Sequence, residues 1–359
     1  MFLTSKNFYF EVISSNGFQG LLGASQIQNL ELTTLQNEGT RNEIFELKSG
    51  EDRWILKQAI VYSGNVYFGF NREVSYYKHI DAKSLKYLSS PHKYFLMPRG
   101  YPLGYSWLCD LLFAKDENAF ENGTNYLLSA LEKCITAFYI STDNFKGVAG
   151  IAEYEVILNA FKNYYTFDDI ELLFELRGAE SDQKNAVKHF LNHPDVTDFL
   201  LNKCTAVVFK RDIIHGDLFV RNILMKEKGY PAVPELYLID FENLAVGDRV
   251  YDLVTLTSSI VAELCLKFGS NSKSEERRGQ LRFFMKEAVK KISEITGEEE
   301  ATILEKYYYL FILHRLQKLV FKKVKNFRKH LDLILKLVRY KATDWYLDDV
   351  ALDLYIQND

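Results

Sequence analysis

Cysteine, proline and glycine are all scarce in this sequence of 359 residues, which has 4, 6 and 19 of them respectively. The low proline and glycine content argues against collagen-like and low-complexity chains. No two cysteines form a Cys-x-x-Cys pair, and no histidine stands beside one at metal-ligand spacing. The sequence therefore favours a protein of a reducing compartment without a metal cluster or a disulfide framework. The cysteines are Cys109, Cys134, Cys204 and Cys265.

Long hydrophobic runs are also lacking. The most apolar stretch, residues 253–266, is interrupted by five polar residues and is too short to span a bilayer. The first residues lack a basic region followed by an apolar core, so we expect no signal peptide. The sequence thus predicts a cytoplasmic protein that does not insert into membranes.

Neither sign of charge dominates. The 44 lysine and arginine residues nearly balance 48 aspartate and glutamate residues, for a net charge of −4. This balance argues against a chain built to coat nucleic acid. With 47% hydrophobic and 14% aromatic residues, the chain can bury a large core, and its length suits one large domain or two lobes.

The pattern of apolar residues divides the chain into two unequal parts. In the first part, residues 42–48 and 54–61 predict strands joined by a turn, residues 70–82 predict a helix, and residues 94–97 predict another strand. After about residue 104 the spacing becomes helical. A small β-rich part followed by a large helical part predicts an α+β fold.

The most regular apolar stripe lies near the C-terminus, where the spacing alternates between three and four residues. We therefore expect a helix over residues 305–341, with one face in the core and a basic face outside. The stripe consists of Leu313, Leu316, Val320, Val324, Phe327, Leu331, Ile334 and Val338.

The segment richest in chemical groups lies in the middle of the chain. Residues 213–224 read IIHGDLFVRNIL, in which Asp217 precedes Asn222 by five residues. An apolar stretch then ends in Asp240. Phosphoryl transfer from a nucleotide needs a carboxylate that accepts the proton of the attacking hydroxyl, and a second carboxylate with an amide oxygen to hold Mg²⁺. This order of residues matches that requirement.

The segment resembles the protein-kinase-like phosphotransferases of the aminoglycoside phosphotransferase and choline kinase families. These carry His-Gly-Asp, an Asn five residues after the Asp, Ile-Asp-Phe-Glu and a later Gly-Asp-Arg with Asp-Leu. Residues 247–253, GDRVYDL, match that last motif. The resemblance implies Asp217 as catalytic base, Asn222 and Asp240 as Mg²⁺ ligands, and His215 as a brace of the loop.

Two further consequences follow from the same resemblance. Asp252 would form hydrogen bonds to the catalytic loop. The sequence FVR at 219–221 departs from the family, which often has His or Asn, then Pro, then Gly. Arg221 puts a cation near the metal site, so its role is open.

The N-terminal part carries the features that the resemblance implies for nucleotide binding. Gly39, Thr40 and Asn42 stand between two predicted strands, as in the family's phosphate loop, although a plain hairpin turn has the same composition. Lys57 lies in an apolar strand, where an unpaired ammonium would be costly. Glu73 is the best candidate for its partner, and Arg72 and Glu51 compete as surface charges.

The resemblance extends to the segment after the last predicted strand. It implies a hinge at residues 95–99, with Met97 beside the adenine of ATP. We assign residues 1–98 to an N-lobe and residues 99–359 to a C-lobe, which together form a two-lobed protein-kinase-like fold.

The expected function is ATP-dependent phosphorylation of a hydroxyl on a small molecule, such as an aminoglycoside, a sugar or amino sugar, or an amino alcohol. A protein kinase is an alternative, but only 11 residues separate Asp240 from Asp252, which leaves no room for an activation loop. A nucleotide-binding scaffold without turnover is another alternative, although Asp217, Asn222 and Asp240 are all present.

The acceptor itself is not settled by the sequence. Residues 151–182 hold eight acidic side chains, which would suit a cationic acceptor, whereas residues 305–341 hold eleven basic ones, which would suit an anion. Both sets can equally be solvated helix faces. The sequence also leaves open ATP against GTP and the oligomeric state.

Overall fold

The structure is a computed structural model. The chain divides into two compact units, Met1–Pro102 and Leu103–Asp359. The structure describes residues 31–36, 42–59, 61–62, 65–66, 68–80, 86–88, 94–98, 117–142, 145, 149–162, 181–226, 235–268, 274–321, 324–340, 345, 351 and 353–354.

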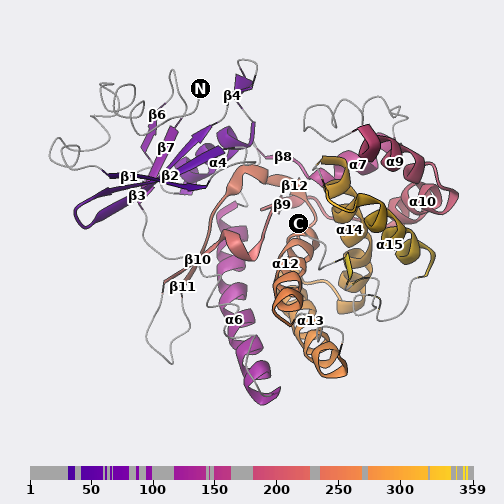
Figure 1. Cartoon of the computed structure of the whole chain (residues 1–359). Coiled ribbons are helices and arrows are strands. Elements are labelled where there is room, and N and C mark those ends of the chain that lie inside the picture. Colours follow the sequence, from indigo (N-terminus) through magenta and orange to yellow (C-terminus); the bar gives the residue numbers. More distant parts are fainter. Residues whose placement is uncertain are drawn as a thin grey trace. The chain divides into compact units, whose positions relative to one another are not determined.

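The first unit contains an antiparallel sheet with the strand order β1-β2-β3-β7-β6 (Figure 1). Its strands are β1 (Glu31–Gln36), β2 (Asn42–Ser49), β3 (Asp52–Ala59), β6 (Lys86–Leu88) and β7 (Tyr94–Pro98). The unit also contains the short strand pair β4 (Val61–Tyr62) and β5 (Asn65–Val66) and the helix α4 (Phe68–Ile80). The strands and the helix predicted from the sequence of this region are therefore confirmed.

The central hairpin of this sheet owes its tight turn to a glycine. Ser49 pairs with Asp52, so the loop has two residues, and Gly50 takes a φ of 62°, which other residues rarely adopt. Across the hairpin, Phe45 pairs with Leu56, and both side chains are buried. The next residue of β3, Lys57, points to the opposite face because side chains alternate along a strand.

The second unit is mostly helical, with two small sheets. Its helices and helical turns are α6 (Glu117–Thr142), α7 (Glu153–Lys162), α9 (Ser181–Leu191), α10 (Pro194–Asp198), η2 (Phe199–Lys203), α11 (Cys204–Ala206), η3 (Val220–Asn222), η4 (Phe241–Asn243), α12 (Val250–Phe268), α13 (Glu275–Thr296), α14 (Glu300–Phe321) and α15 (Phe327–Arg339). Its strands are β8 (Gly150–Ile151), β9 (Asp212–Ile214), β10 (Ile223–Lys226), β11 (Glu235–Leu238) and β12 (Ala245–Gly247).

Two helices form the centre of this unit. Helices α12 and α14 pack against each other, α12 also packs against α13, and α13 packs against α6 (Figure 1). All the side chains from 250 to 262 in α12 and from 306 to 316 in α14 are buried. A helix that is apolar almost all round belongs inside a core, which is where these two lie.

The expected single helix over residues 305–341 is wrong, because the chain forms two helices there, α14 and α15. The buried Gln183 side chain of α9 donates to the Leu319 carbonyl oxygen at 2.7 Å and accepts the Val324 N–H at 3.1 Å. These bonds satisfy backbone groups at the end of α14, and Asn326 then takes a left-handed φ of 56°. The apolar period continues across the break because both helices face the core.

The expected charge pattern is also wrong for α14. Its residues Lys306, His314 and Arg315 are all buried, so this helix has no solvated basic face along that stretch. Helix α15 does follow the amphipathic pattern, since Leu331, Ile334 and Val338 are buried while Lys329 and Arg339 are exposed. Within the described residues, no helix has the length and apolar character needed to cross a membrane.

Candidate functional site

The His-Gly-Asp motif lies on a short loop that leaves the buried end of a strand. Ile213 and Ile214 of β9 are buried, and β9 pairs with β12. Gly216 then takes a φ of 79°, and a side chain there would place its Cβ 2.2 Å from the Asn243 carbonyl oxygen. Glycine is therefore required both by the backbone conformation and by the space. This close approach brings the loop against η4, the turn that follows Asp240.

The side chain of Asp252 holds this loop from the first turns of α12. Its two carboxylate oxygens accept the backbone N–H groups of His215 and Gly216, each at 2.9 Å, and the Tyr139 hydroxyl at 3.0 Å. Asp252 is 1% exposed. Burial raises the pKa of the Asp252 carboxyl, whereas these hydrogen bonds favour its charged form. The hydrogen bonds expected from Asp252 to the loop are confirmed.

His215 is buried within a cluster of aromatic rings. Its ring lies 4.9 Å from that of Phe241 and 5.9 Å from that of Phe138, and Phe138 and Phe241 stack at 5.7 Å. Burial lowers the pKa of His215, so the imidazole is neutral near pH 7. Its Nε2 lies 3.0 Å from the Ile239 carbonyl oxygen and is therefore the protonated nitrogen that donates to it. The imidazole thus ties the loop to the residue before Asp240.

Strand pairing places the two predicted metal ligands next to each other in the fold. In the hairpin β10–β11, Ile223 pairs with Leu238, and the Ile239 N–H donates to the Asn222 carbonyl oxygen at 3.0 Å. Asp240 follows directly, with a left-handed φ of 67°. The Asn222 side chain donates its Nδ2 to the Asp217 carbonyl oxygen at 2.9 Å.

This orientation of the Asn222 amide decides what the side chain can bind. Because Nδ2 is held by the backbone of Asp217, the oxygen Oδ1 is the atom that remains for a metal ion. An amide oxygen and the Asp240 carboxylate are hard oxygen donors of the kind that Mg²⁺ prefers. The residues of this loop therefore fit a magnesium ion.

Arg221 makes contact with α12. Its guanidinium lies 2.9 Å from the Glu263 carboxylate, and its side chain is 68% exposed. The preceding residue is also tied to α12, because the Val220 N–H donates to the Ser259 hydroxyl at 3.0 Å. The open question of Arg221 is thereby answered in part, since its charge is matched by an acid on α12.

In the first unit, Lys57 and Glu73 form a buried ion pair. The Lys57 Nζ lies 2.5 Å from the Glu73 carboxylate, and the two residues are 5% and 1% exposed. The pairing expected from the position of Lys57 in an apolar strand is therefore confirmed. A lysine ammonium has three donors and can also contact an anion such as a phosphate. Its role in nucleotide binding stays a prediction.

Several predicted residues lie partly or wholly outside the described part of the chain. Gly39 and Thr40 are not described, and of Asn42 and Met97 only the backbone is, at the start of β2 and opposite Ile55 in β7. Most of the acidic segment lies outside as well, namely Asp168, Asp169, Glu171, Glu175 and Glu180.

The sequence analysis missed a buried ionic network around Asp248. The Asp248 carboxylate accepts the Val250 N–H at 2.9 Å and the Lys210 N–H at 2.8 Å, and it pairs with the Lys306 Nζ at 2.8 Å. Lys306 also binds Glu298 at 2.5 Å. Asp248 thus satisfies a backbone donor at the start of α12, the helix that carries Asp252. The sequence feature that could have indicated this network is Lys306, a lysine directly before a long apolar run.

The comparisons with known proteins agree with this fold. Residues 160–280 match the model of a family described as the phosphotransferase enzyme family, APH. An ethanolamine kinase of Plasmodium vivax has 14% identity, with 95% of this chain and 90% of that chain aligned and a TM-score of 0.53. A choline kinase of Cryptosporidium parvum has 9% identity, 98% and 100% coverage, and the same TM-score of 0.53. No curated protein sequence matches significantly.

At these identities the two solved structures establish the fold, which is the predicted α+β protein-kinase-like fold. The family match covers the loop from His215 to Asn222, Asp240 and the GDRVYDL motif. The resemblance inferred from those residues is therefore confirmed. The match to the phosphotransferase enzyme family covers residues 160–280, about a third of this chain.

Proposed function

We propose that this enzyme transfers the γ-phosphoryl group of ATP to a hydroxyl group of a small molecule. The candidate acceptors are aminoglycosides, sugars or amino sugars, and amino alcohols. The observation that carries the proposal is the fixed loop, in which Asp252 binds the two N–H groups directly before Asp217. A loop held in this way can keep one carboxylate in position without help from the substrate, and positioning contributes most of the catalysis in phosphoryl transfer.

Asp217 is the proposed base. Its carboxylate would align the acceptor hydroxyl and accept its proton as the bond to phosphorus forms. Asn222 and Asp240 would hold Mg²⁺, which neutralises charge on the phosphate oxygens when it is bound. The Nδ2 bond to the Asp217 carbonyl oxygen supports this role for Asn222, because it fixes the amide before any metal binds.

The nucleotide is proposed to be bound by the first unit as well. Lys57, held by Glu73, would contact phosphate oxygens. The backbone of Gly39, Thr40 and Asn42 would cradle the phosphates, and Met97 would border the adenine. The assignment of residues 1–98 to an N-lobe and 99–359 to a C-lobe belongs to the same proposal.

A small acceptor is favoured over a protein substrate by the segment that follows Asp240. The chain from Asp240 to Asp252 passes directly through η4 and β12 into α12, and each of these residues is described. A protein kinase needs a long activation loop in this interval to dock its substrate. The short connection supports a small molecule instead.

The test compares the wild type with Asp217→Asn in an assay of ADP release over a panel of aminoglycosides, amino sugars, hexoses, ethanolamine and choline. We expect turnover to fall by about 10²–10⁴-fold, while ATP affinity measured by titration calorimetry stays nearly unchanged. Asp212→Asn is the matched control, because among the described residues that carboxylate on β9 forms one ion pair, with Arg249 at 3.7 Å. Full turnover in Asp217→Asn would contradict the assignment of Asp217 as the base.

The magnesium assignment has its own measurement. Asp240→Ala should abolish the dependence of nucleotide binding on Mg²⁺, measured by calorimetry with and without the metal. Metal-dependent binding of wild-type strength in this variant would contradict the ligand role. If no acceptor releases ADP with the wild type although ATP binds, the scaffold without turnover would be favoured.

A further inference from the structure

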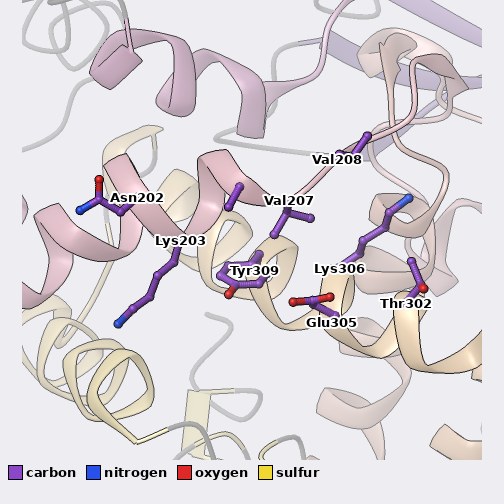
Figure 2. Close-up of a pocket in the computed structure, with 9 residues that line it drawn as sticks. Asn202, Lys203, Val207, Val208, Thr302, Glu305, Lys306 and Tyr309 are labelled. Atoms are coloured by element: carbon purple, nitrogen blue, oxygen red, sulfur yellow. The ribbon is translucent and has the colours of Figure 1, made fainter.

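A cavity of about 450 Å³ lies in the second unit between the segment 202–208 and the first turns of α14 (Figure 2). None of its lining residues belongs to the loop from His215 to Asn222, and Asp240 does not line it either. Its floor is formed by α14, which contributes Thr302, Glu305 and Tyr309. The cavity is therefore unused by the proposed phosphoryl transfer.

The fold produces this cavity through an irregular helix. Residues Phe199–Lys203 form a π-helix, a rare conformation that is often found at functional sites. After α11 the chain leaves the helix at Val207, which is extended, with a φ of −79° and a ψ of 129°. The chain then passes over α14, and the side chain of Val208 is 82% exposed at the rim. Val208 therefore adds apolar surface at the rim of the cavity.

The charges around the cavity are matched except for one. The Lys203 ammonium lies 3.0 Å from the Asp198 carboxylate and points away from the cavity (Figure 2). Lys306 is held by Asp248 and Glu298. Glu305 has no ion-pair or hydrogen-bond partner among the residues that the structure describes. One carboxylate therefore leaves the cavity with a net negative charge.

The Glu305 carboxylate is turned toward the Tyr309 ring (Figure 2). Burial and then the charge of Glu305 raise the pKa of the Tyr309 hydroxyl, which agrees with their closeness. Thr302 lies one turn before Glu305 on α14, and Figure 2 shows it on the other side of Glu305 from Tyr309. The Glu305 carboxylate is thus the charged acceptor at one end of a cavity whose other wall is Val207 and Val208.

We propose that this cavity is a binding site for a small aliphatic primary amine in its ammonium form. The ammonium group would donate hydrogen bonds to the Glu305 carboxylate. The aliphatic body would cover Val208 and pack against Val207 and the Tyr309 ring. Glu305 disfavours an anion, and a neutral ligand would form no ion pair with this exposed carboxylate.

The test uses n-butylamine as the probe and the whole chain labelled at its valine methyl groups. Methyl NMR spectra are recorded at neutral pH without nucleotide, and the Val207 and Val208 signals are assigned by substitution to alanine. We expect saturable shifts of these two signals with n-butylamine, weaker binding of 1-butanol and no binding of butyrate. Glu305→Gln should weaken the binding of n-butylamine by up to about fivefold, because the ion pair that is lost is exposed to solvent.

Two variants serve as controls. Glu300→Gln removes an exposed carboxylate from the first turn of α14 outside the lining and should leave the affinity unchanged. Asp217→Asn should also bind n-butylamine normally, so the result does not depend on the proposed catalysis. Val208→Lys, at the exposed rim, places a competing cation there and should abolish binding even if Glu305→Gln fails to fold.

Three results would overturn the proposal. They are the absence of saturable shifts at Val207 and Val208, equal affinity for 1-butanol, and full affinity in a folded Glu305→Gln protein. Loss of turnover in Asp217→Asn with normal n-butylamine binding supports both proposals separately. Loss of n-butylamine binding in Asp217→Asn would contradict the proposal that this site is separate from the loop that carries Asp217, and would leave the proposed catalysis untouched.

Discussion

The replacement of Gly216 by alanine tests whether the loop geometry controls turnover. Gly216 has a φ of 79°, and an added Cβ would lie 2.2 Å from the Asn243 carbonyl oxygen. Such contacts are essentially never below 3.0 Å, and the obstructing atom is backbone, so it cannot rotate away. Either the loop that carries Asp217 or the turn that follows Asp240 must therefore move by about 1 Å.

Two costs add in this variant. A left-handed φ costs a residue with a Cβ about 1–2 kcal/mol relative to glycine. A displacement of about 1 Å at a catalytic group can lower the rate about 10²-fold. We therefore expect Gly216→Ala to lower the free energy of unfolding by at least about 2 kcal/mol, and kcat by about 10²-fold in the protein that remains folded.

Gly297→Ala provides a matched control within the same unit. Gly297 ends α13 with a φ of 67°, so alanine there suffers the same backbone strain, but no atom lies within 4 Å of its Cβ. Urea unfolding measures both stabilities, and ADP release with the best acceptor measures both rates. Gly297→Ala should lose stability and keep its kcat. If Gly216→Ala behaved like Gly297→Ala in both assays, the link between loop geometry and turnover would be refuted.

Other buried groups give predictions of the same kind. Lys306→Met would leave the buried Asp248 carboxylate without its cation and should lower the free energy of unfolding by about 3–5 kcal/mol, measured by urea unfolding. The control Lys291→Met breaks partly exposed ion pairs and should change this free energy by less than about 1 kcal/mol. Burial and neighbouring cations lower the pKa of His330 to about 4, so the unfolded chain binds a proton more readily than the folded one between about pH 6.5 and 4. Stability should accordingly be lost as the pH falls through this window, by at most about 3 kcal/mol, and His330→Gln should show a smaller loss than the wild type when both are unfolded at pH 7 and pH 4.5.

The parts of the fold that could be predicted from the sequence are those that local order determines. The hairpin between β2 and β3 follows from alternating apolar residues around a turn, and the Lys57–Glu73 pair follows from the cost of an unpaired ammonium in an apolar strand. The roles proposed for Asp217, Asn222 and Asp240 follow from their spacing, because phosphoryl transfer needs a base and metal ligands of these residue types. Local sequence patterns are therefore sufficient to predict an interaction when the two partners lie in the same element or in elements close in the sequence.

The parts that could not be predicted depend on contacts between distant residues. The end of α14 is determined by Gln183, which lies 136 residues before Leu319 in the chain. No property of residues 319–326 taken alone shows that a buried amide binds there. The apolar periodicity indicates which helix face is buried. It does not indicate a break between two helices that face the same core.

The loop from His215 to Asn222 lies along one face of α12. Asp252 binds the N–H groups of His215 and Gly216, while Ser259 and Glu263, seven and eleven residues further along the helix, bind Val220 and Arg221. These three positions share one helix face, since seven and eleven residues are close to two and three turns.

Three contacts with one helix therefore support the loop, whose residues 219–221 are FVR. The exposed pair between Arg221 and Glu263 contributes only about 0.2–1 kcal/mol to stability. Because the Glu263 carboxylate matches the charge of Arg221, the arginine serves to fasten the end of the loop to α12. The buried hydrogen bonds to Asp252 therefore contribute most of the stability of the loop. Removing them should displace Asp217.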